Sequence, residues 1–137
     1  MPLQLSRVKY DALNARQKEN YNFQKVSAVL ADYGFVTLRL NDDWQGADFI
    51  AQHIDGSTFL RVQLKGRLSF DKKYLGKGLF IAFLCEGELY LYSHDELLDQ
   101  VLAGTGIAST KSWTESGGYS FPRAFRRPRH RVVTEPK

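Results

Sequence analysis

Residues 44–67, WQGADFIAQHIDGSTFLRVQLKGR, constrain the fold of this 137-residue chain more than any other segment. From Thr58 to Lys65 apolar and polar residues alternate, which is the two-residue period of a β-strand. The apolar members of the segment therefore point to one side of the strand. Its polar members, which include Gln63 and Lys65, point to the other, so an amide and an ammonium group stand side by side.

A neighbouring strand is expected to begin at Asp48, and Asp55-Gly56-Ser57 has the composition of a turn that joins two strands. The carboxylate of Asp48 can then reach the amide of Gln63 and the ammonium group of Lys65. An acid, an acceptor carbonyl and a lysine that converge on one spot could bind a metal ion and a phosphate.

Size and composition predict one globular domain. The chain is long enough for a core, and its 43% of hydrophobic and 25% of charged residues are ordinary for a soluble protein. The longest apolar run, residues 79–85, is too short to cross a bilayer, and the first residues do not begin a secretory signal. Cys85 lies in that run and has no second cysteine to pair with, so it is expected to be a buried small hydrophobe. We expect a cytoplasmic protein.

The positive charge is concentrated at the C-terminus. The net charge is +4, but the residues from Tyr119 onward carry +5, which leaves −1 for residues 1–118. We therefore expect a single domain over residues 1–120 and a basic tail over residues 121–137, with Arg126 and Arg127 as candidate nucleic-acid contacts. A basic tail suits a polyanion, and it equally suits a solvated terminus that keeps the protein soluble.

A long helix is predicted over residues 15–33. Asn14 followed by Gln17 resembles a capping box, and Gly34 supplies the stop. Glu19 falls on the axis of the apolar stripe of this helix, one turn before the stripe begins. Its carboxylate either lies at the exposed end of the helix, where acids favour the helix dipole, or points into a cleft.

The remaining pattern predicts an α/β fold. Strands are expected at 35–40, 48–51, 58–65, 79–84 and 89–92, and a second helix from a capping box at residues 93–96 to about residue 104. Polar turns are expected at residues 41–43 and 86–88, and loops at 67–78 and, around Trp113, at 105–120. The order αβββ-loop-ββα predicts a mixed central sheet of about five strands flanked by helices. Strand 79–84 is continuously apolar and therefore expected to be buried on both faces.

The polar residues of the central hairpin suit phosphodiester hydrolysis. That reaction needs a divalent metal, acidic groups that hold it, and a cation near the developing charge. Mg²⁺, or Mn²⁺ in its place, takes oxygen ligands, and one or two carboxylates can suffice. Asp48 and Glu19 can supply them, with the side chain of Gln63 or the carbonyl of Leu64 as a further ligand. Lys65 can orient the attacking water and offset charge on phosphorus.

Three features occur in one order: an acid-bearing helix, then Gly46-Ala47-Asp48-Phe49-Ile50, then Val62-Gln63-Leu64-Lys65-Gly66. In this the chain resembles the PD-(D/E)XK nuclease superfamily, in particular archaeal Holliday-junction resolvases and Mrr-type endonucleases, over about residues 15–95. The resemblance implies a restriction-endonuclease-like core and a homodimer acting on DNA. It makes Asp48 the metal-binding aspartate, Lys65 the catalytic lysine and Glu19 the helix acid. Gln63 stands where the family usually has an acid.

The sequence departs from the common pattern at two positions. Ala47 replaces a frequent proline, and Gln63 replaces an acid, which removes one negative charge from the metal site. A nuclease fold that has lost turnover and binds nucleic acid is therefore the competing hypothesis. A third possibility is an interaction domain in which Asp48 is a strand-edge acid, and Gln63 and Lys65 form the solvent face of an edge strand.

The connection after the second strand is basic. Its cations and a tyrosine are candidates for contacts with phosphates or bases, or they form a solvated loop. These residues are Arg67, Lys72, Lys73, Tyr74 and Lys77. The three histidines do not have the spacing of metal ligands, and His94 is expected only to begin the second helix. No P-loop is present.

Overall fold

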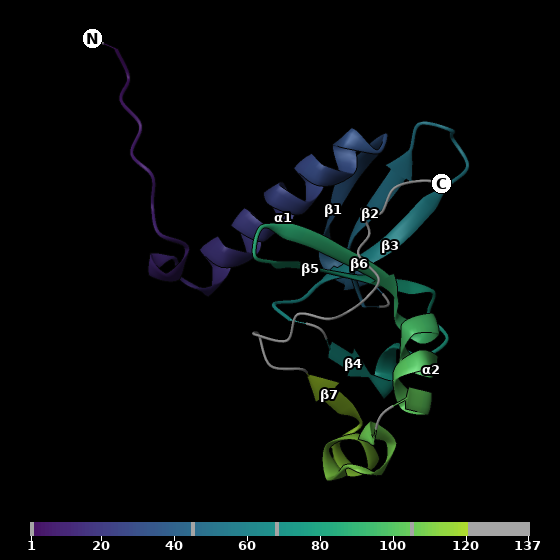
Figure 1. Cartoon of the computed structure of the whole chain (residues 1–137). Coiled ribbons are helices and arrows are strands. Elements are labelled where there is room, and N and C mark those ends of the chain that lie inside the picture. The colour runs from purple at the N-terminus through teal and green to yellow at the C-terminus, as the bar shows by residue number, and fades with distance from the viewer. Residues whose placement is uncertain (1, 45, 68, 105, 121–137) are drawn as a thin grey trace.

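The fold is one mixed β-sheet with a helix packed on each face (Figure 1). This computed structural model describes residues 2–44, 46–67, 69–104 and 106–120, without the side chains of residues 42–44. The helices and strands are, in order, α1 (Ala15–Asp32), β1 (Phe35–Trp44), β2 (Ala47–His53), β3 (Phe59–Leu64), β4 (Ser69–Asp71), β5 (Leu79–Cys85), β6 (Glu88–Ser93), α2 (His94–Gly104) and β7 (Gly118–Ser120). Short 3₁₀ turns lie at Tyr10–Ala12 (η1), Lys72–Tyr74 (η2) and Ile107–Ser109, and a π-helical turn at Ser112–Ser116. None of the described helices has the length and apolar character that a bilayer crossing requires.

The main sheet has the strand order β1-β2-β3-β5-β6. Strands β3 and β5 are parallel, and the other neighbouring pairs are antiparallel. The expected mixed five-stranded sheet and the order αβββ-loop-ββα are therefore confirmed. In addition, β4 and β7 form a separate two-stranded sheet.

Helix α1 begins and ends where the sequence indicates. The side chain of Asn14 accepts a hydrogen bond from the N–H of Gln17, and the Gln17 side chain accepts one from the N–H of Asn14, which completes the capping box. Gly34 follows the helix with φ +86°, a conformation that favours glycine. The buried Val26 and Leu30 of α1 pack on Phe49 and other residues of one sheet face. This packing fixes the orientation of the helix that carries Glu19.

Strand β5 is buried from both sides, as predicted. Ala82 belongs to the core beneath α1, whereas Ile81 and Phe83 belong to the core beneath α2. The second core also contains Phe70 and Trp113, which come from the segments predicted as loops.

Three turn and loop predictions differ from the structure. Residues 41–43 lie within β1, whose register with β2 shifts between Arg39 and Trp44, so the edge strand continues through a polar segment. The connection 67–78 contains β4 and η2, and the segment 105–120 contains three short elements including β7. Both segments acquire structure because they bury aromatic rings against α2 and β5, which local composition does not reveal.

Gly46 stands immediately before β2, at the start of the candidate site. Its φ is +88°, and a Cβ atom at this position would lie 2.8 Å from Cδ1 of Leu79 and 3.1 Å from the ring of Tyr74. The neighbouring Ala47 is fully buried in a small cluster with the same two residues. Glycine therefore permits both the backbone conformation and the close packing beneath Asp48.

Candidate active site

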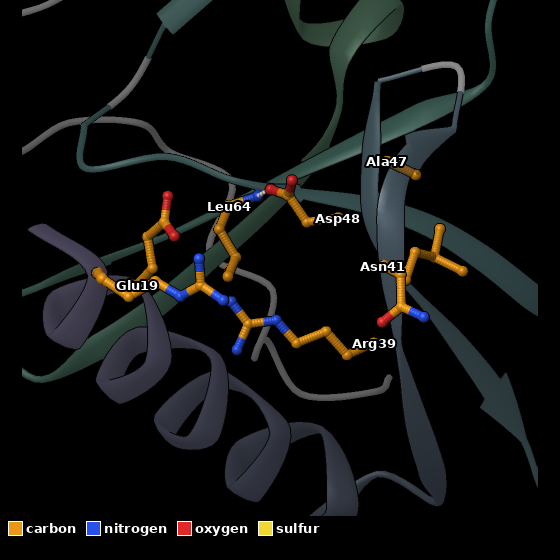
Figure 2. A pocket seen from close by; sticks show the side chains of 8 residues that line it. Glu19, Arg39, Asn41, Ala47, Asp48 and Leu64 are labelled. Carbon is orange, nitrogen blue, oxygen red and sulfur yellow. Dashed lines mark hydrogen bonds between the residues drawn. The ribbon is translucent and has the colours of Figure 1, made fainter.

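Asp48 lies where β2 and β3 separate. The paired residues of these strands run from Gln52 and Phe59 to Phe49 and Val62. Beyond that pair, Oδ2 of Asp48 accepts a hydrogen bond of 2.7 Å from the backbone N–H of Leu64 (Figure 2). The carboxylate thus takes a backbone donor that a continuing ladder would have used, and this bond fixes its orientation.

Asp48 and Glu19 line one cleft of about 360 Å³ between α1 and the ends of β1, β2 and β3 (Figure 2). We call it the acidic cleft. Its lining residues are Arg16, Glu19, Arg39, Leu40, Asn41, Ala47, Asp48 and Leu64. Glu19 and Asp48, the two acids that the sequence predicts as metal ligands, therefore line the same cleft, although 29 positions separate them in the chain. Leu64, the candidate carbonyl ligand, lies in the same cleft.

The acidic cleft also contains two guanidinium groups that the sequence analysis did not select. The Nη1 atom of Arg39 donates to Oδ1 of Asn20 (2.7 Å), and its guanidinium carbon lies 4.9 Å from the centre of the Phe23 ring. Arg16 lines the cleft from the first turn of α1. Among the described residues neither arginine forms an ion pair with Glu19. Position on an amphipathic helix could have identified Arg16, since it precedes Glu19 by three residues.

Gln63 does not line the acidic cleft. Its side chain is 7% exposed, and its Oε1 atom has no hydrogen-bond partner among the described residues. A buried carbonyl oxygen without a partner is costly, so the position of Gln63 favours an additional group, such as a water molecule or a cation, beside it.

Lys65 also lies outside the lining of the acidic cleft. Its backbone N–H donates to the carbonyl of Ala82 (2.9 Å), and its Nζ atom lies 5.5 Å from the centre of the Tyr74 ring. The sequence predicts that Asp48, Gln63, Lys65 and Glu19 converge; of these, only Asp48 and Glu19 line the acidic cleft, together with Leu64. The alternative in which Gln63 and Lys65 form the solvent face of an edge strand is wrong, because β3 is the central strand of the sheet.

The donor atoms in the acidic cleft suit a hard divalent cation. They are the carboxylate oxygens of Asp48 and Glu19, and Mg²⁺ prefers oxygen ligands. Leu64, whose carbonyl is the further candidate ligand, lines the same cleft. The described residues include no cluster of three or more His, Cys, Asp or Glu side chains that could hold a metal. Carboxylate oxygens suit Mg²⁺, which usually keeps several water ligands, better than they suit a soft metal.

The cations of the connection 67–78 have different environments. Arg67 is exposed, and Lys77 is half-buried with its carbonyl accepting a hydrogen bond from Arg61. The Nζ atoms of Lys72 and Lys73 lie over aromatic rings, 5.2 Å from the centres of Trp113 and Tyr74 respectively.

Tyr74 is buried, whereas the sequence predicts a loop tyrosine that contacts phosphates or bases. Its side chain is only 6% exposed and its ring meets the ring of His94 edge to face, with 5.6 Å between centres. The ring is part of the core and is not available to stack on a base. Arg126 and Arg127 lie outside the described residues.

His94 begins α2, as expected, and in addition forms buried hydrogen bonds that the sequence does not predict. It is fully buried, and its Nε2 accepts a hydrogen bond from the N–H of Asp71 (3.1 Å). Because Nε2 accepts, the ring proton is on Nδ1. The Nδ1–H group then donates to the carboxylate of Asp95 (2.8 Å). Asp95 also accepts from the N–H of Gly76. Burial opposes the charged form of Asp95, but the bonds from His94 and Gly76 hold the pKa of its carboxyl below the usual value. These bonds attach the connection 67–78 to α2.

Two further hollows meet the end of β3, and Lys65 lines both. One, of about 430 Å³, lies toward α1, and the other, of about 490 Å³, lies between β4, β7 and the π-helical turn. Because Leu64 lines the acidic cleft, the end of β3 borders all three hollows.

Comparisons with protein-family models, curated proteins and solved structures found no match to this chain.

Proposed function

We propose that this protein is a metal-dependent endonuclease of the PD-(D/E)XK type that hydrolyses phosphodiester bonds of nucleic acid, with DNA as the expected substrate. The observation that supports the proposal most directly is the shared cleft of Asp48 and Glu19. Orientation of Asp48 by the N–H of Leu64 adds to it, because a preorganised carboxylate loses little freedom when it binds a cation.

In this proposal Asp48 and Glu19 hold Mg²⁺, with the carbonyl of Leu64 as a further ligand. When bound, the metal would polarise the phosphate and acidify a water molecule. Arg16 and Arg39 attract the phosphodiester to the cleft by charge. The ammonium group of Lys65 stabilises the negative charge that develops on the phosphate oxygens. The unpartnered oxygen of Gln63 accepts a hydrogen bond from water beside the site.

The alternative is a nuclease fold that binds nucleic acid without turnover. Two observations favour it: Gln63 supplies no charge where an acid is usual, and Lys65 does not line the acidic cleft. A homodimer is proposed for either function, on the resemblance alone, and sedimentation velocity would measure it.

Cleavage of labelled linear, nicked and branched DNA with Mg²⁺ or Mn²⁺ tests the proposal. The variants are Asp48→Ala, Lys65→Ala and Glu19→Gln, with Glu96→Gln as the matched control because Glu96 is an exposed acid in the first turn of α2. Metal-dependent cleavage that only the first three variants lose is the expected result. Salt-sensitive binding without cleavage would establish the alternative. A protein that neither cleaves nor binds DNA contradicts the DNA proposal and makes RNA the next substrate to test.

A further inference from the structure

The hollow of about 430 Å³ beside Lys65 combines aromatic rings with cations, and we call it the tyrosine–lysine cleft. It lies between η1, α1, the end of β3 and the β5–β6 turn. Its lining residues are Tyr10, Tyr21, Asn22, Lys25, Val29, Lys65, Gly66, Leu84, Glu86 and Gly87. The volume falls within the ~300–1,000 Å³ of small-molecule sites.

The two tyrosines of this cleft are held in place. Their rings meet edge to face with 5.3 Å between centres, and the Tyr10 hydroxyl accepts a hydrogen bond from the side chain of Asn22 (2.9 Å). Tyr21 remains 37% exposed. Because Tyr10 supports Tyr21 from one side, Tyr21 presents a positioned aromatic surface to the cleft.

Cations surround these rings. The Nζ atom of Lys25 lies 5.3 Å from the centre of the Tyr21 ring, and that of Lys18 lies 5.3 Å from the centre of the Tyr10 ring. Of the lysines, Lys25 and Lys65 line the cleft itself; Lys65 is the residue that follows β3, and Glu86 adds one carboxylate to the lining. Lysine side chains are flexible, so an ammonium group can move from a tyrosine ring to a phosphate. An aromatic group of a ligand can then stack on the ring that the ammonium group has left.

We propose that the tyrosine–lysine cleft binds one unpaired nucleotide of the substrate strand. The base stacks on Tyr21, while Lys25 and Lys65 bind the adjoining phosphates. A base offers its face to a protein side chain only when it is outside a duplex stack. The inference rests on the proposed function, because Lys65 lines this cleft and directly follows Leu64, whose N–H holds the carboxylate of Asp48. It selects strands with an overhang, a flap or a loop as the substrate class, in preference to continuous duplex.

Fluorescence anisotropy with the full chain tests this inference. The probes are a single-stranded oligonucleotide, a duplex with a single-stranded overhang and a blunt duplex, without divalent metal. The first variant is Tyr21→Leu, and its control is Tyr33→Leu, because Tyr33 is the C-cap of the same helix and is 39% exposed, close to Tyr21. The second variant is Lys25→Gln, and its control is Lys111→Gln, which removes one exposed positive charge elsewhere.

The wild type is expected to bind the overhang duplex more tightly than the blunt duplex. Tyr21→Leu is expected to weaken binding of the single strand and of the overhang by about 5- to 100-fold, the range for loss of one stacked base, and to leave the blunt duplex unaffected. Lys25→Gln is expected to weaken binding of the same probes more than Lys111→Gln does.

Equal effects of Tyr21→Leu and Tyr33→Leu on single-strand binding, together with equal effects of the two lysine variants, would overturn the inference. This result is independent of cleavage. A protein that cleaves DNA with Mg²⁺ but shows no dependence on Tyr21 or Lys25 retains its nuclease function and loses this site. A protein that binds unpaired strands through Tyr21 without cleaving them retains the site and loses the nuclease function.

Discussion

The acidic cleft and the tyrosine–lysine cleft flank the same strand end but are built in different ways. In the acidic cleft a backbone N–H fixes Asp48, and a hydrogen bond and a ring contact anchor Arg39. In the tyrosine–lysine cleft the cations are the flexible ammonium groups of lysines lying over tyrosine rings. The first has the rigidity that chemistry at one atom needs, whereas the second has the adaptability that suits binding of a strand.

The comparison shows how one strand can serve two sites. Leu64 is the last residue of β3 and borders the acidic cleft, and Lys65 follows it directly and borders the tyrosine–lysine cleft. Residues of α1 line both clefts, so the two clefts follow one another along the same helix. Variants that affect one cleft, both clefts, or the support beneath them can separate the two roles.

The largest expected effect belongs to Asp48→Asn. The substitution keeps an oxygen that can accept from the N–H of Leu64 but removes the charge that, in the proposed function, would hold the metal. We expect cleavage to fall at least about 1,000-fold, because the metal supplies several kcal/mol of transition-state stabilisation. Single-turnover kinetics measures this, and anisotropy on the same preparation is expected to give unweakened single-strand binding. Parallel losses of both properties would show that the two clefts act as one.

Lys65→Met is expected to affect both clefts. If Lys65 acts on the reacting phosphate as proposed, its loss is expected to lower kcat by about 100-fold. If Lys65 also binds a phosphate in the tyrosine–lysine cleft, the slope of log affinity against log salt for a single strand is expected to become shallower by about 0.7. Kinetics and a salt titration measure the two effects separately. A loss confined to one of them would assign Lys65 to that cleft alone.

Gly46→Ala tests the support beneath the acidic cleft. The added Cβ meets Leu79 and Tyr74, and alanine is strained at φ +88°, so we expect the free energy of unfolding to fall by about 1–3 kcal/mol. Gly56→Ala is the matched control, because Gly56 has φ +78° and no neighbouring atom within 4 Å of an added Cβ. Urea denaturation of both variants separates crowding from backbone strain. Equal losses would mean that the packing around Gly46 yields without cost.

Asn14→Ala has the smallest expected effect. It removes the cap of α1, the helix that supplies Glu19 to one cleft and Tyr21 to the other, and such caps contribute about 1 kcal/mol. Thermal unfolding is expected to show this loss, with a similar small decrease in both cleavage and single-strand binding. A decrease in only one activity would place the first turn of α1 in a single cleft.

The sequence was sufficient for features that depend on local pattern. The capping box at Asn14, the stop at Gly34 and the apolar strand predicted at 79–84 each follow from residues close together in the chain, and the structure contains all of them. Glu19 and Asp48 line one cleft, but the helical period of α1 left the direction of Glu19 open, and the resemblance to a nuclease superfamily is what selected this acid.

Features that depend on distant partners could not be predicted. His94 looks like an ordinary first-turn residue, and only the fold brings the N–H of Asp71 to its ring. Tyr74 looks like an exposed loop aromatic, and only the packing of Ala47 and Leu79 buries it. Arg39 lies on an edge strand and reaches the acidic cleft because α1 crosses beside it.

Because Leu64 and Lys65 border different clefts, changes in the length of β3 have a consequence for both clefts. Deleting one residue within β3 would shift the register of the residues that follow and place Lys65 at the position of Leu64. The turn at residues 55–57 is exposed, so it can absorb such changes. Homologues of this protein are therefore expected to vary in length at that turn, while the spacing from Phe59 to Gly66 stays constant.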